Sequence, residues 1–246
     1  MAGGHAEDNY SFFYGHELWL WDNIPVNDCD KDRLFLDPVR GRSSRLGNYG
    51  HTAVVANPMN QWECSKITLN TMAHYMWNSE RYMPELSWEL SVREFAGELA
   101  EDMMFFCRQN LNSRLYSGGY PELDDALAER DLERLDAYFS RLEQAAVRLG
   151  GLDNAKFIEE AGPWLRRAIG DAVLWRAVRR QLENTPGPLA GKDVLKCLER
   201  CRSYGVRLGS DPAVRAAEAL GIELPEMEAE IKAEKKAETK EEDQHV

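Results

Sequence analysis

Apolar residues recur at three- and four-residue steps along most of this 246-residue chain, and this period restricts its fold more than any other feature. The helical pattern begins near Asn60 and continues, with interruptions, to about residue 224. The first part of the chain lacks it, and Pro25, Pro38 and Pro58 interrupt any long element there. Amphipathic helices must bury their apolar stripes against one another. The pattern therefore predicts an all-α fold of helical hairpins or a bundle.

Glycine, proline and capping residues divide the helical part. One long helix is predicted over 85–116 and a second over 121–149, each ending at a pair of glycines. Asp153 is the predicted N-cap of the next helix, which Pro163 should kink or split. Asp211 is the predicted N-cap of the last helix.

Composition shifts along the chain predict four segments. Residues 1–58 read as an extended, aromatic-rich N-terminal arm, 59–117 as a helical segment and 118–224 as helical hairpins. Residues 225–246 form an acidic, charged tail, either a solvated helix or disordered. Exposed aromatic and arginine side chains are common anchors in protein interfaces. The predicted partner-binding residues are Phe12, Phe13, Tyr14, Trp19, Trp21, Arg40, Arg42 and Arg45.

The stretch "RGRSSRLG" places Ser43 and Ser44 after two arginines. This pattern marks both serines as candidate phosphorylation sites for a basophilic kinase. The same arginines also suit a loop that docks onto an acidic surface. Both interpretations stay open on the sequence alone.

The charge balance excludes one class of partner. The formal net charge is −12, from 30 basic and 42 acidic residues. Because phosphate neutralisation supplies much of the affinity for nucleic acid, a chain without a basic stripe is not expected to bind it. No apolar run approaches the roughly 18 residues of a membrane span.

The cysteines and the N-terminus predict a compartment. Five cysteines, an odd number, are widely spaced without a CxxC pair. The first residues include His5, Glu7 and Asp8, which do not suit a signal peptide. We therefore expect free thiols and a cytoplasmic location, with a cytoskeletal or ciliary setting as one version of it.

The stretch "NDCDKDRLFL" is the closest approach to a metal motif. Asp28, Asp30 and Asp32 have the spacing of the first three ligands of a calcium loop. However, Arg33 stands where that loop needs glycine, and Val39 where it needs a bidentate glutamate. The sequence therefore predicts an acidic turn and no metal site.

Cys197 and Cys201 lie four residues apart, hence on one helical face. The histidines are scattered and offer no second ligand pair for zinc. Packing in the core is the favoured interpretation of both thiols. No metal or other cofactor is predicted.

No familiar catalytic motif appears: GxSxG, the P-loop, GxGxxG and HExxH are all missing. The sequence therefore predicts no catalytic residue. The alternative is an all-α enzyme, or a helical bundle that binds a small molecule, with a site near His74. Glu63, Cys64 and His51 are the other reactive side chains of that alternative site.

The patterns "LERLDAYFSRLEQAAVRLGG" and "DVLKCLERCRSYGVRLGSDPAVRAAEAL" share a helix, a glycine stop, an aspartate and an alanine-rich helix. Residues 121–222 resemble the helical-hairpin segments of eukaryotic scaffold proteins of the ciliary axoneme. The resemblance implies a non-catalytic structural subunit of a larger complex. Its implied partners are other protein subunits of the assembly, docked through the N-terminal arm and the helical body.

Overall fold

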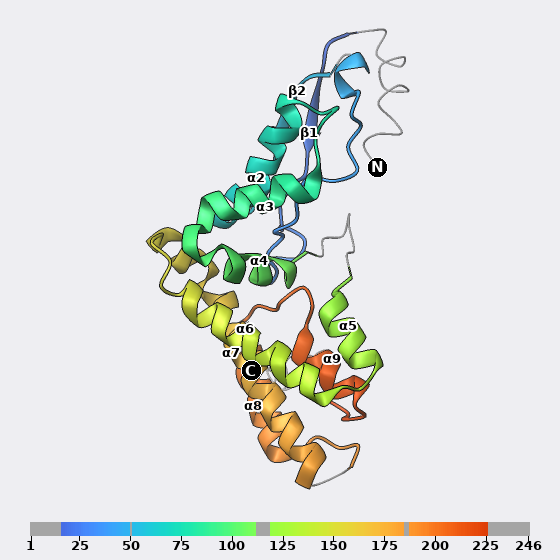
Figure 1. Ribbon diagram of the computed structural model, residues 1–246, viewed down its shortest axis with the longest axis vertical. Coiled ribbons are helices and arrows are strands. Elements are labelled where there is room, and N and C mark those ends of the chain that lie inside the picture. Colours follow the sequence, from blue (N-terminus) through green and yellow to red (C-terminus); the bar gives the residue numbers. More distant parts are fainter. Residues whose placement is uncertain (1–15, 50, 112–118, 185–186, 226–246) are drawn as a thin grey trace, which may run out of the picture.

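The computed structural model describes residues 16–49, 51–111, 119–184 and 187–225. Over these ranges the chain forms two strands and eight α-helices, which pack into a helical body with the strands at one end (Figure 1). The strands are β1 (Leu18–Asp22) and β2 (His51–Ala56). The α-helices are α2 (Trp62–Trp77), α3 (Pro84–Ala96), α4 (Ala100–Arg108), α5 (Pro121–Ala128), α6 (Leu132–Leu149), α7 (Ala155–Asn184), α8 (Lys192–Arg202) and α9 (Pro212–Ala219). Short 3-10 turns span Leu46–Tyr49 and Gly97–Leu99.

The all-α fold class is wrong, because β1 and β2 pair as a parallel two-stranded sheet. Trp19 pairs with Ala53 and Trp21 with Val55, with an irregularity in register after Leu18. Each strand is short, and its partner lies about thirty residues away, so a local period does not reveal the pairing. Part of the expected extended arm is therefore a sheet.

The connection between the strands also contributes to the core. Leu34–Val39 is buried throughout. The indole N–H of Trp88 donates to the Leu36 carbonyl at 2.8 Å, and the Leu36 N–H donates to the Asn110 carbonyl at 3.0 Å. These bonds fasten the connection to α3 and to the end of α4.

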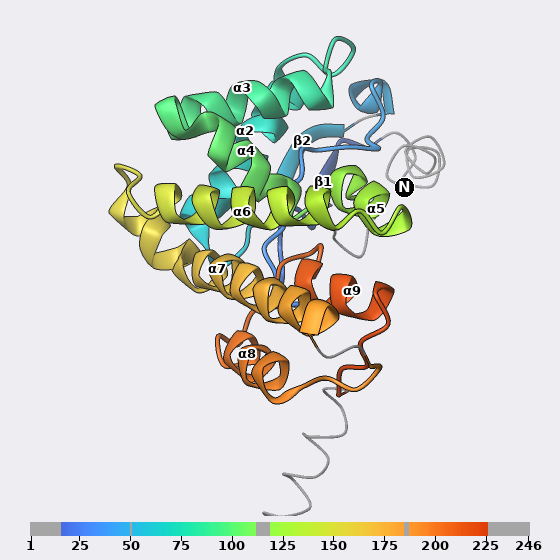
Figure 2. The same ribbon diagram turned by 60° about the horizontal axis from the view of Figure 1, so that its bottom comes forward.

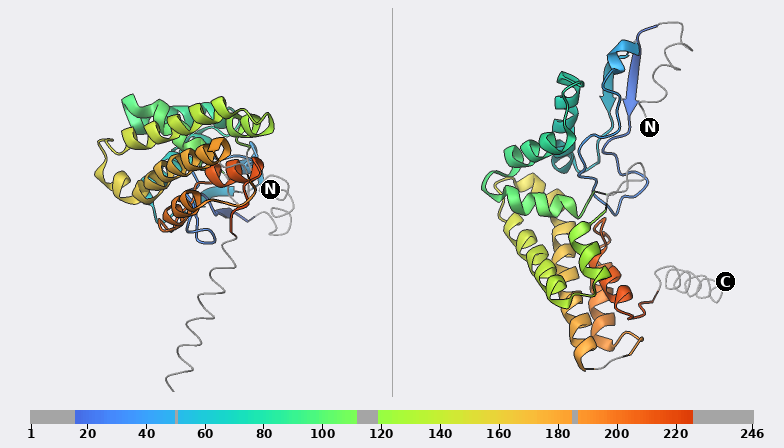
Figure 3. Two further views of the ribbon diagram at one scale, coloured as in Figure 1. Left: turned by 90° about the horizontal axis from the view of Figure 1, so that it is seen from below. Right: turned by 45° about the vertical axis from the view of Figure 1, so that its right-hand side comes forward.

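The helices pack against one another in layers, the first of which lies next to the sheet. α6 and α7 lie side by side across the molecule, with α4 packed on α6 and with α8 and α9 packed on α7 (Figure 2). α2, α3 and α4 contact one another in sequence, and α2 also contacts α7. The strands project from this stack at the end opposite α8 (Figures 1 and 3).

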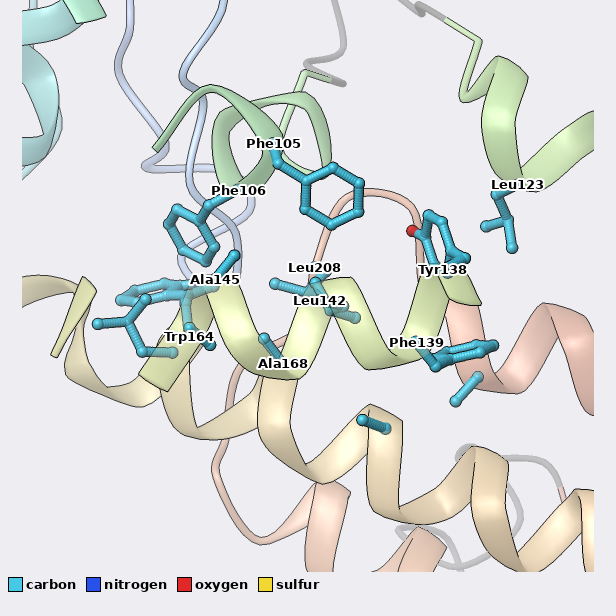
Figure 4. Close-up of a cluster of buried hydrophobic side chains, with 14 of the residues drawn as sticks. Phe105, Phe106, Leu123, Tyr138, Phe139, Leu142, Ala145, Trp164, Ala168 and Leu208 are labelled. Atoms are coloured by element: carbon cyan, nitrogen blue, oxygen red, sulfur yellow. The ribbon is translucent and has the colours of Figure 1, made fainter. Parts of the chain in front are cut away.

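Aromatic side chains fill the centre of the stack (Figure 4). Phe139 of α6 and Trp175 of α7 are stacked, with ring centroids 5.0 Å apart. The Tyr138 hydroxyl donates to Gln109 Oε1 at 2.5 Å, which satisfies a buried polar group. One buried cluster continues from Leu34 in the strand connection to Ile222 after α9.

Three helix boundaries differ from those that the pattern predicts. The expected helix over 85–116 breaks at Gly97, which has φ +54°, and the one over 121–149 breaks at Arg130, which has φ +51°. Conversely, α7 is not split at Pro163, where the sequence predicts a kink or a split. Pro163 cannot donate to the carbonyl of Glu159 four residues earlier, but Glu159 is exposed, so water is available to that carbonyl.

The tail over 226–246 lies outside the described residues, as do Phe12, Phe13 and Tyr14 of the expected arm. Among the helices of the described ranges, none combines the length and the apolar character that crossing a membrane requires.

Candidate functional site

The carboxyl ends of β1 and β2 bring together polar residues that are distant in sequence. Asn23 follows β1 directly, and Asn57 follows β2 directly. Because the strands are parallel, both ends lie at the same edge of the sheet, where α/β proteins usually place their ligands. The Asn57 N–H donates to the Asp22 carbonyl at 2.9 Å, and the Val26 N–H donates to the Asn57 carbonyl at 3.0 Å. The two strand ends are thus held in one register.

The two carboxamides hydrogen-bond to each other, and this bond fixes how they point. Asn23 Oδ1 accepts from Asn57 Nδ2 at 3.2 Å and from the Trp21 indole N–H at 2.8 Å. An oxygen with two donors leaves Asn23 Nδ2 as the outward group, and Asn57 likewise keeps Oδ1 as an acceptor. Within the described ranges neither of these two atoms has a protein partner. The strand ends therefore offer one donor and one acceptor side by side.

Asp22 anchors this edge. Its carboxylate accepts from Arg42 Nε at 2.8 Å and from Arg42 Nη2 at 2.5 Å, and the two side chains are only 7% and 13% exposed. Arg42 also donates to the Arg40 carbonyl at 2.5 Å. A buried, bidentate ion pair of this kind fixes the geometry of its surroundings. The pair ties the end of β1 to the strand connection.

The sheet leaves large aromatic surfaces in solvent. Trp19 is 74% exposed and Trp21 is 64% exposed, both on one face of β1. Parallel sheets normally have both faces covered. Exposed indoles beside polar strand ends therefore provide apolar surface for a ligand or for further chain.

The acids of "NDCDKDRLFL" lie in the loop after β1 but do not converge. The Asp30 N–H donates to the Asn27 carbonyl at 3.0 Å, which forms a turn, and Asp28 is exposed. Asp32 instead accepts from Arg207 Nε at 2.6 Å. In the described part of the chain, no group of three or more His, Cys, Asp and Glu side chains has a metal-binding arrangement.

The arginines of the predicted partner-binding set have different roles. Arg40 Nη2 bonds Glu85 at 2.7 Å, and Arg42 bonds Asp22. Arg45 is exposed. With Trp19 and Trp21 they remain predicted partner-binding residues.

The candidate phosphorylation sites lie beside the C-terminal end of α2, where Ser43 is half-buried and Ser44 is exposed. The Ser43 carbonyl accepts from the Tyr75 hydroxyl, and the Ser44 carbonyl accepts from Ser79 Oγ, each at 2.7 Å. These bonds use backbone oxygens, and the Ser43 hydroxyl oxygen accepts from the Arg45 N–H at 3.2 Å. Phosphorylation of both serines stays a prediction.

The alternative site around His74 does not assemble. Glu63 and Cys64 lie in the first turn of α2, whereas His74 lies in its last turn, about 15 Å away along the axis. His74 Nδ1 pairs with Ser87 Oγ at 2.7 Å. Burial raises the pKa of the Cys64 thiol well above its usual value, which disfavours a thiolate nucleophile. His51 begins β2.

Sequence reasoning missed the asparagines at the strand ends. A signal was present: "LWLWDNIP" and "HTAVVANP" are each a short apolar run that ends in asparagine with a proline close behind. Strands end at such turn residues. What the sequence did not show is that the two runs pair in parallel.

Comparison with known proteins places these residues in context. A sequence model of the family described as NAGidase, beta-N-acetylglucosaminidase, matches residues 4–108, which include both strands. The proteins named "Protein O-GlcNAcase" from Rattus norvegicus and Mus musculus are each 41% identical over 54 residues, which is 22% of this chain and 6% of the relative.

Solved structures resemble a larger part of the chain. An O-GlcNAc hydrolase of Thermobaculum terrenum matches with a TM-score of 0.72 and 23% identity, over 88% of this chain and 51% of that chain. CpGH84B matches with a TM-score of 0.72 and 20% identity, over 87% of this chain and 41% of that chain. CpGH84D matches with a TM-score of 0.68 and 16% identity, over 87% and 42%. The chain thus corresponds to about half of the solved chains or less.

These matches correct several expectations. The resemblance of residues 121–222 to ciliary scaffold hairpins is wrong, because the solved structures that share this arrangement include an O-GlcNAc hydrolase. The expectations of a non-catalytic scaffold subunit, of a protein without enzymatic function and of assembly subunits as its partners fall with it. Over most of its length the chain has the fold of these solved structures, and the segment with the paired asparagines lies within the match to the glucosaminidase family model.

Proposed function

We propose that this chain forms part of a glycoside hydrolase that removes β-linked N-acetylglucosamine, and that its strand ends bind the sugar. The observation that carries the proposal is the oriented pair Asn23–Asn57 at the carboxyl ends of two parallel strands. The β-N-acetylglucosaminidase match over residues 4–108 gives this pair its chemical context.

The donor and acceptor suit an amino sugar. N-acetylglucosamine carries hydroxyls, which both donate and accept, and an acetamido group with an N–H and a carbonyl. Asn23 Nδ2 matches a carbonyl or hydroxyl oxygen, and Asn57 Oδ1 matches an N–H or O–H. Because an unpaired polar group in a closed site is costly, such matching discriminates between sugars. The exposed ring of Trp21, whose indole N–H donates to Asn23, adds apolar surface beside the pair.

Binding of this kind contributes to hydrolysis by positioning. Most glycosidases cleave the bond with two carboxyl groups that flank it. A ring held by fixed hydrogen bonds reaches that geometry without a further loss of freedom. Asp22 is not assigned such a role, because its two oxygens are engaged by Arg42. The residues described here hold and orient the sugar.

The same proposal includes further strands beside β1 and β2. A two-stranded parallel sheet with exposed indoles is not independently stable. The solved hydrolases are about twice as long as the part that this chain matches. Additional strands of the same enzyme would cover Trp19 and complete the sugar site.

Hydrolysis of a fluorogenic aryl N-acetyl-β-glucosaminide by the natural full-length protein tests the function. We expect activity, and a fall in kcat/KM of about 10- to 100-fold in both Asn23→Ala and Asn57→Ala. Asn60→Ala is the matched control, because Asn60 is an exposed asparagine in the same loop as Asn57. No hydrolysis by the natural protein, or an equal loss in the control, would contradict the proposal.

The relatives' printed name suggests that the sugar is attached to protein. We propose a glycoprotein or glycopeptide as the natural substrate. Release of the sugar from a peptide with O-linked N-acetylglucosamine, compared with release from a chitin disaccharide, tests this. A preference for the disaccharide would contradict it.

A further inference from the structure

We infer that Glu160 is a positioning residue for the sugar site: from α7 it fixes the first turn of α2, and through that turn the loop that presents Asn57. The inference rests on the function proposed above. It concerns a residue of the helical body, beyond the segment that matches the glucosaminidase family. The geometry that carries it runs from α7 through α2 to the strand end.

The first turn of α2 needs acceptors from outside the helix. The N-cap residue Gln61 makes no side-chain capping bond. The amides of Glu63 and Cys64 precede the first intrahelical bonds and would otherwise lack acceptors. Glu160 Oε2 accepts from the Glu63 N–H at 2.7 Å and from the Cys64 N–H at 3.3 Å. A carboxylate at this end also interacts favourably with the helix dipole. Glu160 therefore caps α2 from α7.

A second contact runs between the same two helix starts. Asn154 Nδ2 donates to Glu63 Oε2 at 3.0 Å, while Asn154 Oδ1 accepts from the Phe157 N–H at 3.0 Å. Asn154 thus caps α7 and at the same time holds a side chain of α2. The Asn154 and Lys66 hydrogen bonds lower the pKa of Glu63, so Glu63 is an anion at neutral pH. The two helix starts hold each other at two points, which fixes both position and angle.

From the first turn of α2 the contacts continue to the strand ends. The Met59 N–H donates to Ser65 Oγ at 3.1 Å, and Ser65 Oγ donates to the Gln61 carbonyl at 2.9 Å. Gln61 Oε1 accepts from Asn27 Nδ2 at 3.2 Å, in the loop after β1. Residues 57–61 are therefore held by hydrogen bonds to α2 on one side and to that loop on the other. A displacement of the first turn of α2 is transmitted to Asn57.

Removal of the Glu160 carboxylate should increase the motion of residues 57–61 without removing a group that contacts the sugar. In the natural full-length enzyme, we expect Glu160→Ala to lower kcat/KM for the aryl glucosaminide by about tenfold or more, because small displacements of binding groups are costly. Glu160→Gln keeps an acceptor oxygen and the side-chain shape, so it should retain most of the activity. Glu159→Ala is the matched control, an exposed glutamate of the same helix, and should equal the natural enzyme.

A double-mutant cycle separates positioning from a general loss of stability. If Glu160 acts through Asn57, Glu160→Ala in the Asn57→Ala background should change kcat/KM by less than about twofold. Losses that multiply would overturn the inference, as would an unchanged kcat/KM in Glu160→Ala alone. If Glu160→Ala does not fold, the cycle is run with Glu160→Asp, whose shorter side chain withdraws the acceptor from the Glu63 and Cys64 amides, and losses that multiply again overturn the inference.

Hydrogen exchange distinguishes failure of this inference from failure of the proposed function. If the natural protein neither binds nor hydrolyses N-acetylglucosaminides, the proposed function is wrong. Hydrogen exchange at the amides of residues 57–64 still tests whether Glu160 holds the first turn of α2. Faster exchange there in Glu160→Ala than in Glu159→Ala supports the inference. Unchanged exchange overturns it.

Discussion

At the scale of single residues, the ion pair of Asp22 and Arg42 gives the clearest expectation for stability. Arg42→Ala leaves a carboxylate that is 7% exposed without its partner, and we expect the free energy of unfolding to fall by about 3 kcal/mol. Arg42→Lys should recover only part of it, because lysine cannot bond both oxygens in one plane. Urea denaturation at pH 7 measures both. Arg93→Ala, which removes only exposed ion pairs, should change little, and an equal loss there would contradict the prediction.

Asp37 should make stability depend on pH. Burial raises the pKa of Asp37 to about 8, against the opposing effect of Arg40, and its carboxylate oxygens accept no hydrogen bond within the described ranges. In the window between the unfolded pKa, near 4, and about 8, the folded state binds a proton that the unfolded state has lost. Stability from this group therefore falls as pH rises through that window.

Asp37→Asn removes this titration. We expect the substitution to stabilise the protein more at pH 8 than at pH 5, in denaturant unfolding at both values. The cost of ionising buried Asp37 disappears only near and below the pKa of the unfolded state, so Asp37→Asn still stabilises the protein somewhat at pH 5. Asn60→Ala, an exposed substitution that removes no titratable group, serves as the control and should show no difference between the two pH values. The same gain at both pH values in Asp37→Asn would contradict the prediction.

At the scale of elements, helix caps give a matched pair. Asp131 caps α6, since Oδ1 accepts from the Glu133 and Arg134 amides at 3.1 and 3.0 Å. Asp131→Ala should cost about 1 kcal/mol of unfolding free energy, and Asp131→Asn little. Asp153, the cap expected from sequence, is exposed, and Asn154 makes the bond instead. Asp153→Ala should therefore leave stability unchanged; thermal unfolding that ranks the two alanine variants in reverse would refute this assignment.

The helices could be predicted where their formation depends on residues close together in the sequence. The apolar period located the helical part, because burial of one stripe imposes it. The breaks at Gly97 and Arg130 were missed, since a positive φ at one residue leaves the apolar period nearly intact. The strands and the paired asparagines were missed for the opposite reason. Asn23 and Asn57 meet only through a parallel pairing across 34 positions, and nothing local records it.

At the scale of the whole molecule, the sheet and the helical body are joined by contacts between distant parts of the sequence. The Trp164 indole N–H donates to the Asp32 carbonyl at 3.0 Å, and the Arg207 N–H donates to the same carbonyl at 2.9 Å. The large buried cluster passes through the strand connection and the helix layers, while a second, smaller cluster of Val39, Met72 and Tyr75 packs against Val54 of β2. A sugar site at one end is therefore supported by packing that extends through α7 to α9.

The large buried cluster, which joins the strand connection to every helix from α2 to α9, predicts one unfolding transition. Trp88 in α3 and Trp175 in α7 are both buried, so tryptophan fluorescence reports on both ends of the core, while far-ultraviolet circular dichroism reports on all helices. We expect the two signals to coincide during urea unfolding of the natural protein. Arg207→Ala, which removes a link to Asp32, should shift the midpoint of both curves together. If the curves separate, the sheet end and the helical body unfold independently. The support of the sugar site by α7 is then limited to the hydrogen bonds of Glu160 with the first turn of α2.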